Sequence, residues 1–137
     1  MTLNLTAPHL AGRSVTGDII GNATYLATRH ADGSGLAVIG TGLQSRYPAF
    51  SSDSRTIFFN DNIDSSAEFI YSVNVDGTNL KQLTQSNYAY CPMVLGKLVL
   101  FESTVSPSSN YQIFDMAADG SGMKQLTHDA VSDGLCF

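Results

Sequence analysis

The sequence Asp-Gly-Ser-Gly-Met-Lys-Gln-Leu-Thr at residues 119–127 decides the fold of this chain, because it occurs more than once. A close copy, Asp-Gly-Thr-Asn-Leu-Lys-Gln-Leu-Thr, lies at residues 76–84, and a fainter copy at residues 32–39 keeps the Asp-Gly pair and the apolar positions. Asp32, Asp76 and Asp119, which open the copies, are 44 and 43 residues apart. The chain is therefore built from three repeats of one unit.

Short runs rich in Val, Ile, Phe and Tyr precede each copy, and they predict β-strands separated by polar or Gly-containing turns. In the second repeat these runs lie at residues 47–50, 56–60 and 68–75, and the Asp-Gly turn leads into a returning strand over residues 79–84. In the third repeat they lie at residues 90–94, 98–101 and 111–116, and in the first, less regularly, at residues 13–16 and 25–28. Each repeat is predicted to hold four short antiparallel strands.

A period of about 40 to 50 residues with four strands in each unit is typical of β-propeller blades. The predicted fold is all-β, with blade 1 over residues 1–43, blade 2 over residues 44–87 and blade 3 over residues 88–130. Residues 131–137 are expected to form a strand that completes a neighbouring or partner blade. Because each blade packs between two others, runs such as residues 69–73 are expected to be apolar on both faces.

The second repeat also resembles a known family. Residues 48–59, Pro-Ala-Phe-Ser-Ser-Asp-Ser-Arg-Thr-Ile-Phe-Phe, are similar to the Pro-x-aromatic-Ser-Pro-Asp-Gly-Lys-x-Ile-x-Phe segment of TolB-type propeller repeats. Residues 69–78, followed by Leu83 and Thr84, resemble the closing half of the same repeat. The resemblance covers residues 44–130 and, more weakly, the rest; Ser52 and Ser54 stand where the family has Pro and Gly.

The resemblance implies a ring of six blades, which three blades cannot close. We therefore expect a homodimer, in which a second copy supplies the other three blades and covers the exposed strand edges. Residues 3–5 and 135–137 are the segments expected to complete blades of the partner. The alternative is that the chain is a fragment of a longer propeller, with no independent function.

The composition excludes several kinds of partner. A hydrophobic content of 43% with mean hydropathy +0.01 is that of a soluble globular protein. The net charge of −5 disfavours nucleic acid, and no apolar run approaches the roughly 18 residues that membrane insertion needs. The first residues do not resemble a signal peptide. The expected location is the periplasm if the resemblance to TolB extends to location, and the cytoplasm otherwise.

The two cysteines, Cys91 and Cys136, are 45 residues apart. Two thiols form no metal site without further ligands, so neither a metal nor a cofactor is predicted. The favoured interpretation is that they are small buried hydrophobic residues in neighbouring repeats. The alternative is a disulfide or a redox role.

No motif predicts catalysis. His9, His30 and His128 share no metal-ligand spacing, and no Gly-x-Ser-x-Gly elbow is present. The Gly-x-Gly at residues 40–42 is similar to a dinucleotide-binding loop, but Pro48 arrives before any helix. The Gly-Ser-Gly triplets at residues 33–35 and 120–122 extend hairpin turns. A non-enzymatic role is therefore favoured, and no catalytic residue is predicted.

The loops that precede the innermost strands carry the residue types that most often anchor interfaces, Tyr and Arg. The candidate binding residues are Arg46, Tyr47, Tyr88, Tyr90, His128 and Asp129. They predict a TolB-like scaffold that binds a protein or peptide at the mouth of the propeller channel. The same loops could instead be ordinary solvated segments. The resemblance also implies a carbohydrate-active or peptidase-associated alternative, because related propellers occur in sugar lyases and ahead of serine peptidases.

Overall fold

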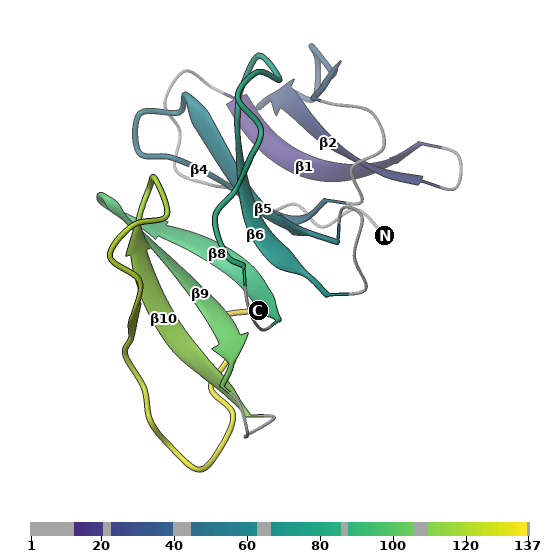
Figure 1. The fold of residues 1–137 in the computed structure, drawn as a ribbon. Coiled ribbons are helices and arrows are strands. Elements are labelled where there is room, and N and C mark those ends of the chain that lie inside the picture. Colours follow the sequence, from purple (N-terminus) through teal and green to yellow (C-terminus); the bar gives the residue numbers. More distant parts are fainter. Residues whose placement is uncertain are drawn as a thin grey trace.

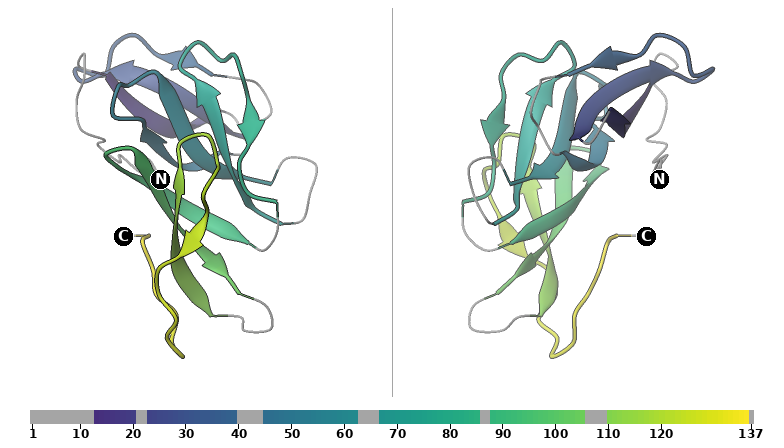
Figure 2. Two further views of the ribbon diagram at one scale, coloured as in Figure 1. Left: turned by 60° about the vertical axis from the view of Figure 1, so that its left-hand side comes forward. Right: turned by 90° about the vertical axis from the view of Figure 1, so that its right-hand side faces the viewer.

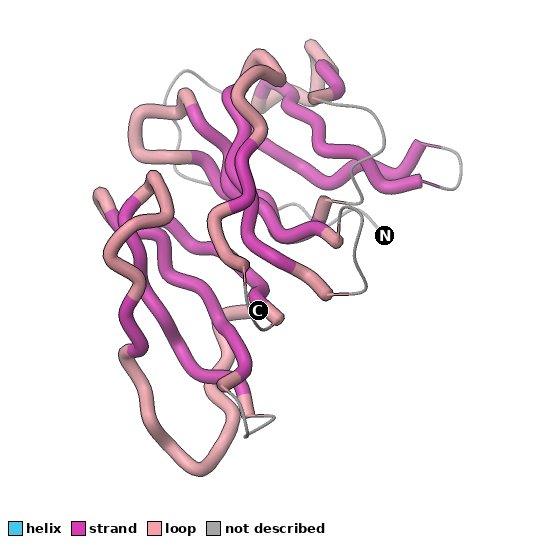
Figure 3. The backbone as a smooth tube through the Cα atoms, viewed as in Figure 1, coloured by secondary structure: helices cyan, strands magenta, loops and turns pink. Residues whose placement is uncertain are grey.

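The computed structural model describes residues 13–20, 23–39, 45–62, 67–85, 88–105 and 110–136. Within these ranges the chain consists of strands and connecting loops, with no helix (Figure 3). The prediction of an all-β fold is therefore confirmed. The described part of the chain also contains no helix that is long and apolar enough to cross a membrane.

The strands form three antiparallel sheets in chain order, which lie side by side as successive blades (Figures 1 and 2). The sheet of blade 1 contains β1 (Arg13–Ile20), β2 (Ala23–His30) and β3 (Ala37–Val38). That of blade 2 contains β4 (Arg46–Phe50), β5 (Thr56–Asp61), β6 (Phe69–Asn74) and β7 (Lys81–Gln82). That of blade 3 contains β8 (Ala89–Leu95), β9 (Leu98–Thr104), β10 (Tyr111–Ala117) and β11 (Lys124–Gln125).

Blades 2 and 3 have the predicted four strands, in the order in which they occur in the sequence. Three strands of blade 1 are described. The innermost strand expected for blade 1 falls in residues 1–12, which lie outside the described part of the chain, as do residues 3–5 and the Gly-x-Gly at residues 40–42.

The Asp-Gly turn is the same structure in each repeat. The backbone N–H and the hydroxyl of Ser121 both donate to Oδ1 of Asp119, at 2.9 and 2.6 Å. Gly120 adopts a φ of 87°, which a residue without Cβ reaches at no steric cost. The copies that open with Asp32 and Asp76 have the same two hydrogen bonds to the carboxylate. The turn interpretation of the Gly-Ser-Gly triplets is confirmed.

The returning strand is shorter than the predicted residues 79–84, because β7 spans Lys81–Gln82 only. Beyond β7, side chains replace the backbone hydrogen bonds of a longer strand. The hydroxyl of Thr84 accepts the N–H of Ile70 at 3.0 Å, and the amide of Gln82 donates to the carbonyl of Thr84 at 2.7 Å. Gln125 and Thr127 repeat this arrangement in blade 3. The Gln-Leu-Thr sequence therefore ends each blade by satisfying backbone groups that the short strand leaves unpaired.

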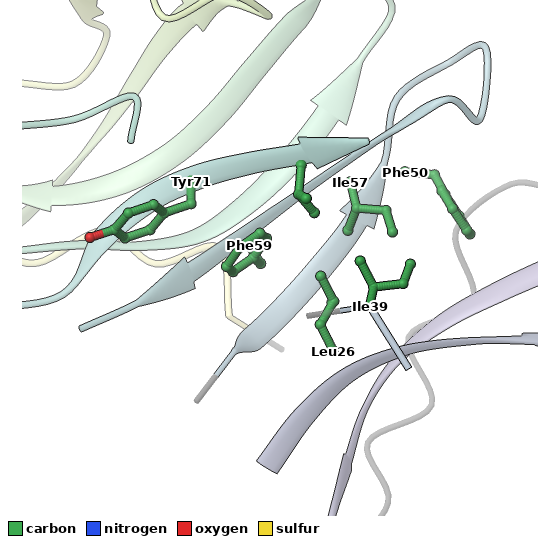
Figure 4. Close-up of a cluster of buried hydrophobic side chains, with 7 residues drawn as sticks. Leu26, Ile39, Phe50, Ile57, Phe59 and Tyr71 are labelled. Carbon is green, nitrogen blue, oxygen red and sulfur yellow. The ribbon is translucent and has the colours of Figure 1, made fainter. Parts of the chain in front are cut away.

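Two hydrophobic cores hold the blades together. In the first, Leu26 and Ile39 of blade 1 pack against side chains of blade 2 (Figure 4): Phe50, Ile57, Phe59, Tyr71 and Val73. In the second, blade 2 meets blade 3 through Phe58, Ile70, Leu83, Ala89, Val99, Phe101 and Met116. Neighbouring residues of β5 thus enter opposite cores, as expected for a blade with two apolar faces. Each buried Phe stabilises the contact by about 1.5–3 kcal/mol.

The innermost strands β4 and β8 each contain a bulge at the same position of the repeat. The pairing of each strand with its neighbour shifts register, and Tyr47 and Cys91 adopt left-handed φ values of 49° and 52° at this point. Both precede a proline, Pro48 and Pro92, which has no N–H to leave unpaired where the ladder is interrupted.

After β11 the chain turns back on itself and ends beside β8 (Figure 1). Residues 126–136 contain no strand. Their path is nevertheless that of an innermost strand, because the N–H of Asp133 donates to the carbonyl of Tyr111 at 2.8 Å, as Ala89 donates to Glu68 at 2.9 Å. We refer to residues 128–136 as the C-terminal segment.

Candidate functional site

Polar and aromatic side chains gather at one end of blades 2 and 3, where β4 and β8 begin and where β5 and β9 end. The Asp-Gly turns lie at the opposite end of the strands. We define the mouth cluster as Arg46, Asn60, Asp61, Glu68, Tyr88, Tyr90 and Tyr111.

Glu68 is the centre of the mouth cluster. Its Oε1 is 3.1 Å from Nη1 of Arg46, and its Oε2 accepts a hydrogen bond from the amide of Asn60. The antiparallel register explains the contact, because Arg46 pairs with Asn60 across β4 and β5. Arg46 is exposed, so the ion pair contributes only about 0.2–1 kcal/mol to stability. Its guanidinium therefore remains accessible to a ligand.

Asp61 is buried beside this pair. Its Oδ2 accepts the hydroxyl of Ser45 at 3.2 Å, and its Oδ1 accepts the N–H of Asn62 at 2.7 Å. Burial raises the pKa of the Asp61 carboxyl, and the two hydrogen bonds oppose this shift without cancelling it.

Three tyrosines form the rest of the cluster. The rings of Tyr88 and Tyr90 are parallel with centroids 6.3 Å apart, and Tyr90 meets Tyr111 edge to face at 5.6 Å. Tyr88 is 43% exposed, while Tyr90 is partly buried. Burial, followed by the negative charge of Glu68, raises the pKa of Tyr90. Tyr90 therefore stays a neutral phenol, and Tyr88 presents an aromatic surface to solvent.

The structure brings three of the residues singled out from the sequence, Arg46, Tyr88 and Tyr90, into this cluster. Tyr47 lies in the bulge of β4. His128 and Asp129 are exposed on the C-terminal segment. That segment is held by Gln112, whose amide donates to the carbonyls of Asp129 and Val131 and accepts the N–H of Asp129.

Asn60, Asp61, Glu68 and Tyr111 are not among the candidate binding residues predicted from the sequence. A signal was present, because Asn60 and Asp61 end an apolar run and Glu68 opens the next one across a hairpin. Polar residues at facing ends of two paired strands lie close in space.

The carboxylates of the mouth cluster are held by partners within the protein. Both oxygens of Glu68 have partners, and so do both oxygens of Asp61. What the mouth cluster exposes is a guanidinium and an aromatic ring.

A second cluster lies in blade 3. Cys91 and Cys136 are joined by a disulfide with their Cα atoms 5.6 Å apart, so the disulfide alternative is confirmed. The favoured interpretation as two small buried residues is wrong, because the two are bonded and Cys136 is exposed, although Cys91 is buried. Beside them Glu102 accepts the N–H of Leu135 at 3.1 Å and lies 2.9 Å from Sγ of Cys136. Contacts over 34 and 45 residues bring these groups together, which spacing alone does not predict.

Comparison with known proteins finds similar solved structures but no similar family or curated sequence. No family model matches the chain, and no curated protein matches it. Among solved structures, a putative TolB from Agrobacterium tumefaciens superposes with a TM-score of 0.73 at 20% identity, covering 83% of this chain and 44% of that protein. TolB from Acinetobacter baumannii superposes with a TM-score of 0.69 at 18% identity, covering 89% of this chain and 31% of that protein. An oligogalacturonate lyase in complex with manganese superposes with a TM-score of 0.59 at 18% identity, covering 76% of this chain and 30% of that protein.

The chain has a TolB-like β-propeller fold. It spans less than half the length of each of these proteins. The expectation from the blade repeat and from the residues that resemble the TolB family is therefore confirmed for the fold.

Proposed function

We propose that this chain is a non-enzymatic propeller scaffold that binds a protein or peptide through the mouth cluster. The observation that carries the proposal is the placement of an exposed Arg46 and an exposed Tyr88 around the ordered Glu68 and Tyr90. Arg and Tyr are the residues most enriched among interface anchors. Arg46 opens β4 and Tyr88 directly precedes β8, so paired strands fix the backbone beside both residues, which limits the entropy that binding must remove.

The geometry favours a ligand with both an acidic group and an apolar group. The Arg46 guanidinium can pair with a carboxylate, and the Tyr88 ring can cover an aliphatic or aromatic side chain. An extended peptide carries both kinds of group on neighbouring residues. A peptide with an acidic residue close to an apolar one is the expected class of partner.

A random-peptide phage library, panned on the immobilised 137-residue chain, tests this proposal. Enriched peptides should bind Arg46→Ala and Tyr88→Ala at least about tenfold more weakly than the wild type, since truncating an anchor residue costs about 2 kcal/mol or more and tenfold corresponds to about 1.4 kcal/mol. Lys97→Ala, in the turn at the other end of β8, is the matched control and should bind normally. Equal binding by all four proteins, or no enriched peptide, would contradict the proposal.

A second candidate is an acidic oligosaccharide. The exposed face of Tyr88 could stack on a sugar ring while Arg46 pairs with a uronate carboxylate. One of the similar structures is an oligogalacturonate lyase. A glycan array probed with wild type and Tyr88→Ala separates the candidates: a Tyr88-dependent signal from acidic glycans, with no enriched peptide, would favour this second function.

We also propose that a second copy of the chain completes the ring. The face of blade 3 that points away from blade 2 carries Leu100, Ile113 and Leu126 at the positions of Phe58, Ile70 and Leu83. The residues of blade 2 are buried in the second core, whereas Leu126 is exposed. A further blade on this face would bury the same positions again.

A further inference from the structure

Cys91, Cys136 and Glu102 converge on one point in blade 3. One ligand atom from each, the two sulfurs and a carboxylate oxygen, all lie within 4.8 Å of one another. Cys91 is 4% exposed and Glu102 is 9% exposed, while Cys136 is open to solvent. Of the three elements that supply them, β8 and β9 are neighbouring strands of one sheet and the third is the C-terminal segment.

Glu102 differs from the residue at the equivalent position of blade 2. In blade 2 the equivalent position of β5 is Asn60, since Asn60 faces Ile70 and Glu102 faces Ile113, 43 residues further on. Blade 3 thus has a carboxylate where blade 2 has a neutral amide. This carboxylate lies beside the two cysteine sulfurs.

Within the described part of the chain, the Glu102 carboxylate also has no cation to balance it. Across the described ranges, no Lys, Arg or His side chain lies within ion-pair distance of Glu102. Its Oε2 accepts the N–H of Leu135 at 3.1 Å, and its Oε1 lies 2.9 Å from Sγ of Cys136, which carries no hydrogen in the disulfide. A carboxylate buried to this degree is ordinarily paired with a cation or coordinates a metal.

We propose that the reduced form of this chain binds one Zn²⁺ ion through Cys91, Cys136 and Glu102. An external dithiol supplies two electrons and two protons, breaks the disulfide and leaves two thiols and its own disulfide. Zn²⁺ then takes both sulfurs as thiolates, releasing their protons, together with one Glu102 oxygen. Two thiolates and a carboxylate select Zn²⁺ over Mg²⁺ and Ca²⁺, which prefer oxygen ligands. Three protein ligands leave a fourth position for water.

The proposal makes the metal site and the disulfide alternative states of the same cysteines. Oxidation removes both thiolate ligands and should expel the ion. In either state the C-terminal segment stays attached to β8, through sulfur in one case and through the metal in the other. This inference is independent of the proposed function of the mouth cluster.

The test is a titration of the 137-residue chain with ZnCl₂ alone, in the reduced state under nitrogen and in the oxidised state. The reduced chain should bind one Zn²⁺ and release about two protons for each ion bound, and the oxidised chain should bind none. Cys136→Ser should abolish binding. Glu102→Gln should weaken it by at least about 100-fold, the upper end of the loss seen for residues that only support a ligand. Glu68→Gln is the matched control and should bind as the wild type does.

A measurement on the unaltered chain covers the case in which Glu102→Gln does not fold. X-ray absorption at the zinc edge should show two sulfur scatterers at about 2.3 Å and oxygen scatterers at about 2.0–2.2 Å. Four sulfur scatterers, or oxygen scatterers alone, would overturn the assignment. So would a reduced chain that binds no more Zn²⁺ than a Cys91→Ser, Cys136→Ser double variant.

Discussion

Leu83 and Leu126 occupy the same position of the repeat, 43 residues apart, yet Leu83 is 8% exposed and Leu126 is 40% exposed. The difference comes from the next blade. Leu83 packs in the second core against blade 3, close enough that a Cβ on Gly120 would lie 3.3 Å from its Cδ2. None of the sheets formed by the described residues covers Leu126 in the same way.

The pair gives a prediction about stability. Leu83→Ala should lower the free energy of unfolding by about 2–4 kcal/mol, because it removes buried methyl groups and leaves a cavity. Leu126→Ala should change the stability of the isolated chain by no more than about 0.5 kcal/mol. Urea denaturation of the chain at high dilution measures both. Equal losses in the two variants would show that Leu126 is already covered in the single chain.

Ser54 provides a second prediction. It adopts a φ of 57°, a left-handed conformation, at the position where TolB-type repeats have Gly. The left-handed conformation costs a residue with a side chain about 1–2 kcal/mol, and Gly avoids this cost. Part of the gain is offset because Gly has greater conformational freedom in the unfolded chain. Ser54→Gly should therefore stabilise the chain by about 0.5 kcal/mol, measured by thermal unfolding.

The control for Ser54 is the same change two residues earlier. Ser52 does not have a positive φ, and its hydroxyl donates to the carbonyl of Gly96 at 2.5 Å. Ser52→Gly should therefore destabilise the chain. A stabilising effect of both changes, or of neither, would contradict the assignment of strain to Ser54.

Asp61 predicts a dependence of stability on pH. Burial raises its pKa from the ordinary 3.8, so the folded chain holds the proton more tightly than the unfolded chain. The free energy of unfolding should fall as pH rises from 3.8 through the raised pKa, and should remain lower above it. Asp61→Asn removes this loss, so its stability relative to the wild type should increase over the same interval. Parallel curves of stability against pH would contradict the prediction.

The sequence was sufficient for the parts of the fold that local chemistry determines. The Asp-Gly turns could be predicted because an Asp carboxylate, a Gly and a following Ser or Thr determine the turn by themselves. The strand order followed from repetition of that turn. The length of β7 could not be predicted, since the side chains of Gln82 and Thr84 end it early by competing for backbone groups.

Most of the site depends on contacts between distant residues. Arg46 and Tyr88 could be selected by residue type, but Glu68, which orders Arg46, is 22 residues away from it in sequence. The group of Cys91, Glu102 and Cys136 requires the C-terminal segment to return to β8. One clue was available for it: Glu102 directly follows the apolar run at residues 98–101. A charge at such a point needs a partner, which the sequence does not identify.

A channel mouth exists only if the ring of blades is closed, and we propose that a second copy of the chain closes it. Multi-angle light scattering of the 137-residue chain at micromolar concentration measures it most directly. We expect a mass twice the 14.6 kDa of one chain, and a return to the single mass for Leu126→Asp, which places a charge on the face of blade 3 that carries Leu126. A wild-type mass of 14.6 kDa at that concentration would contradict it.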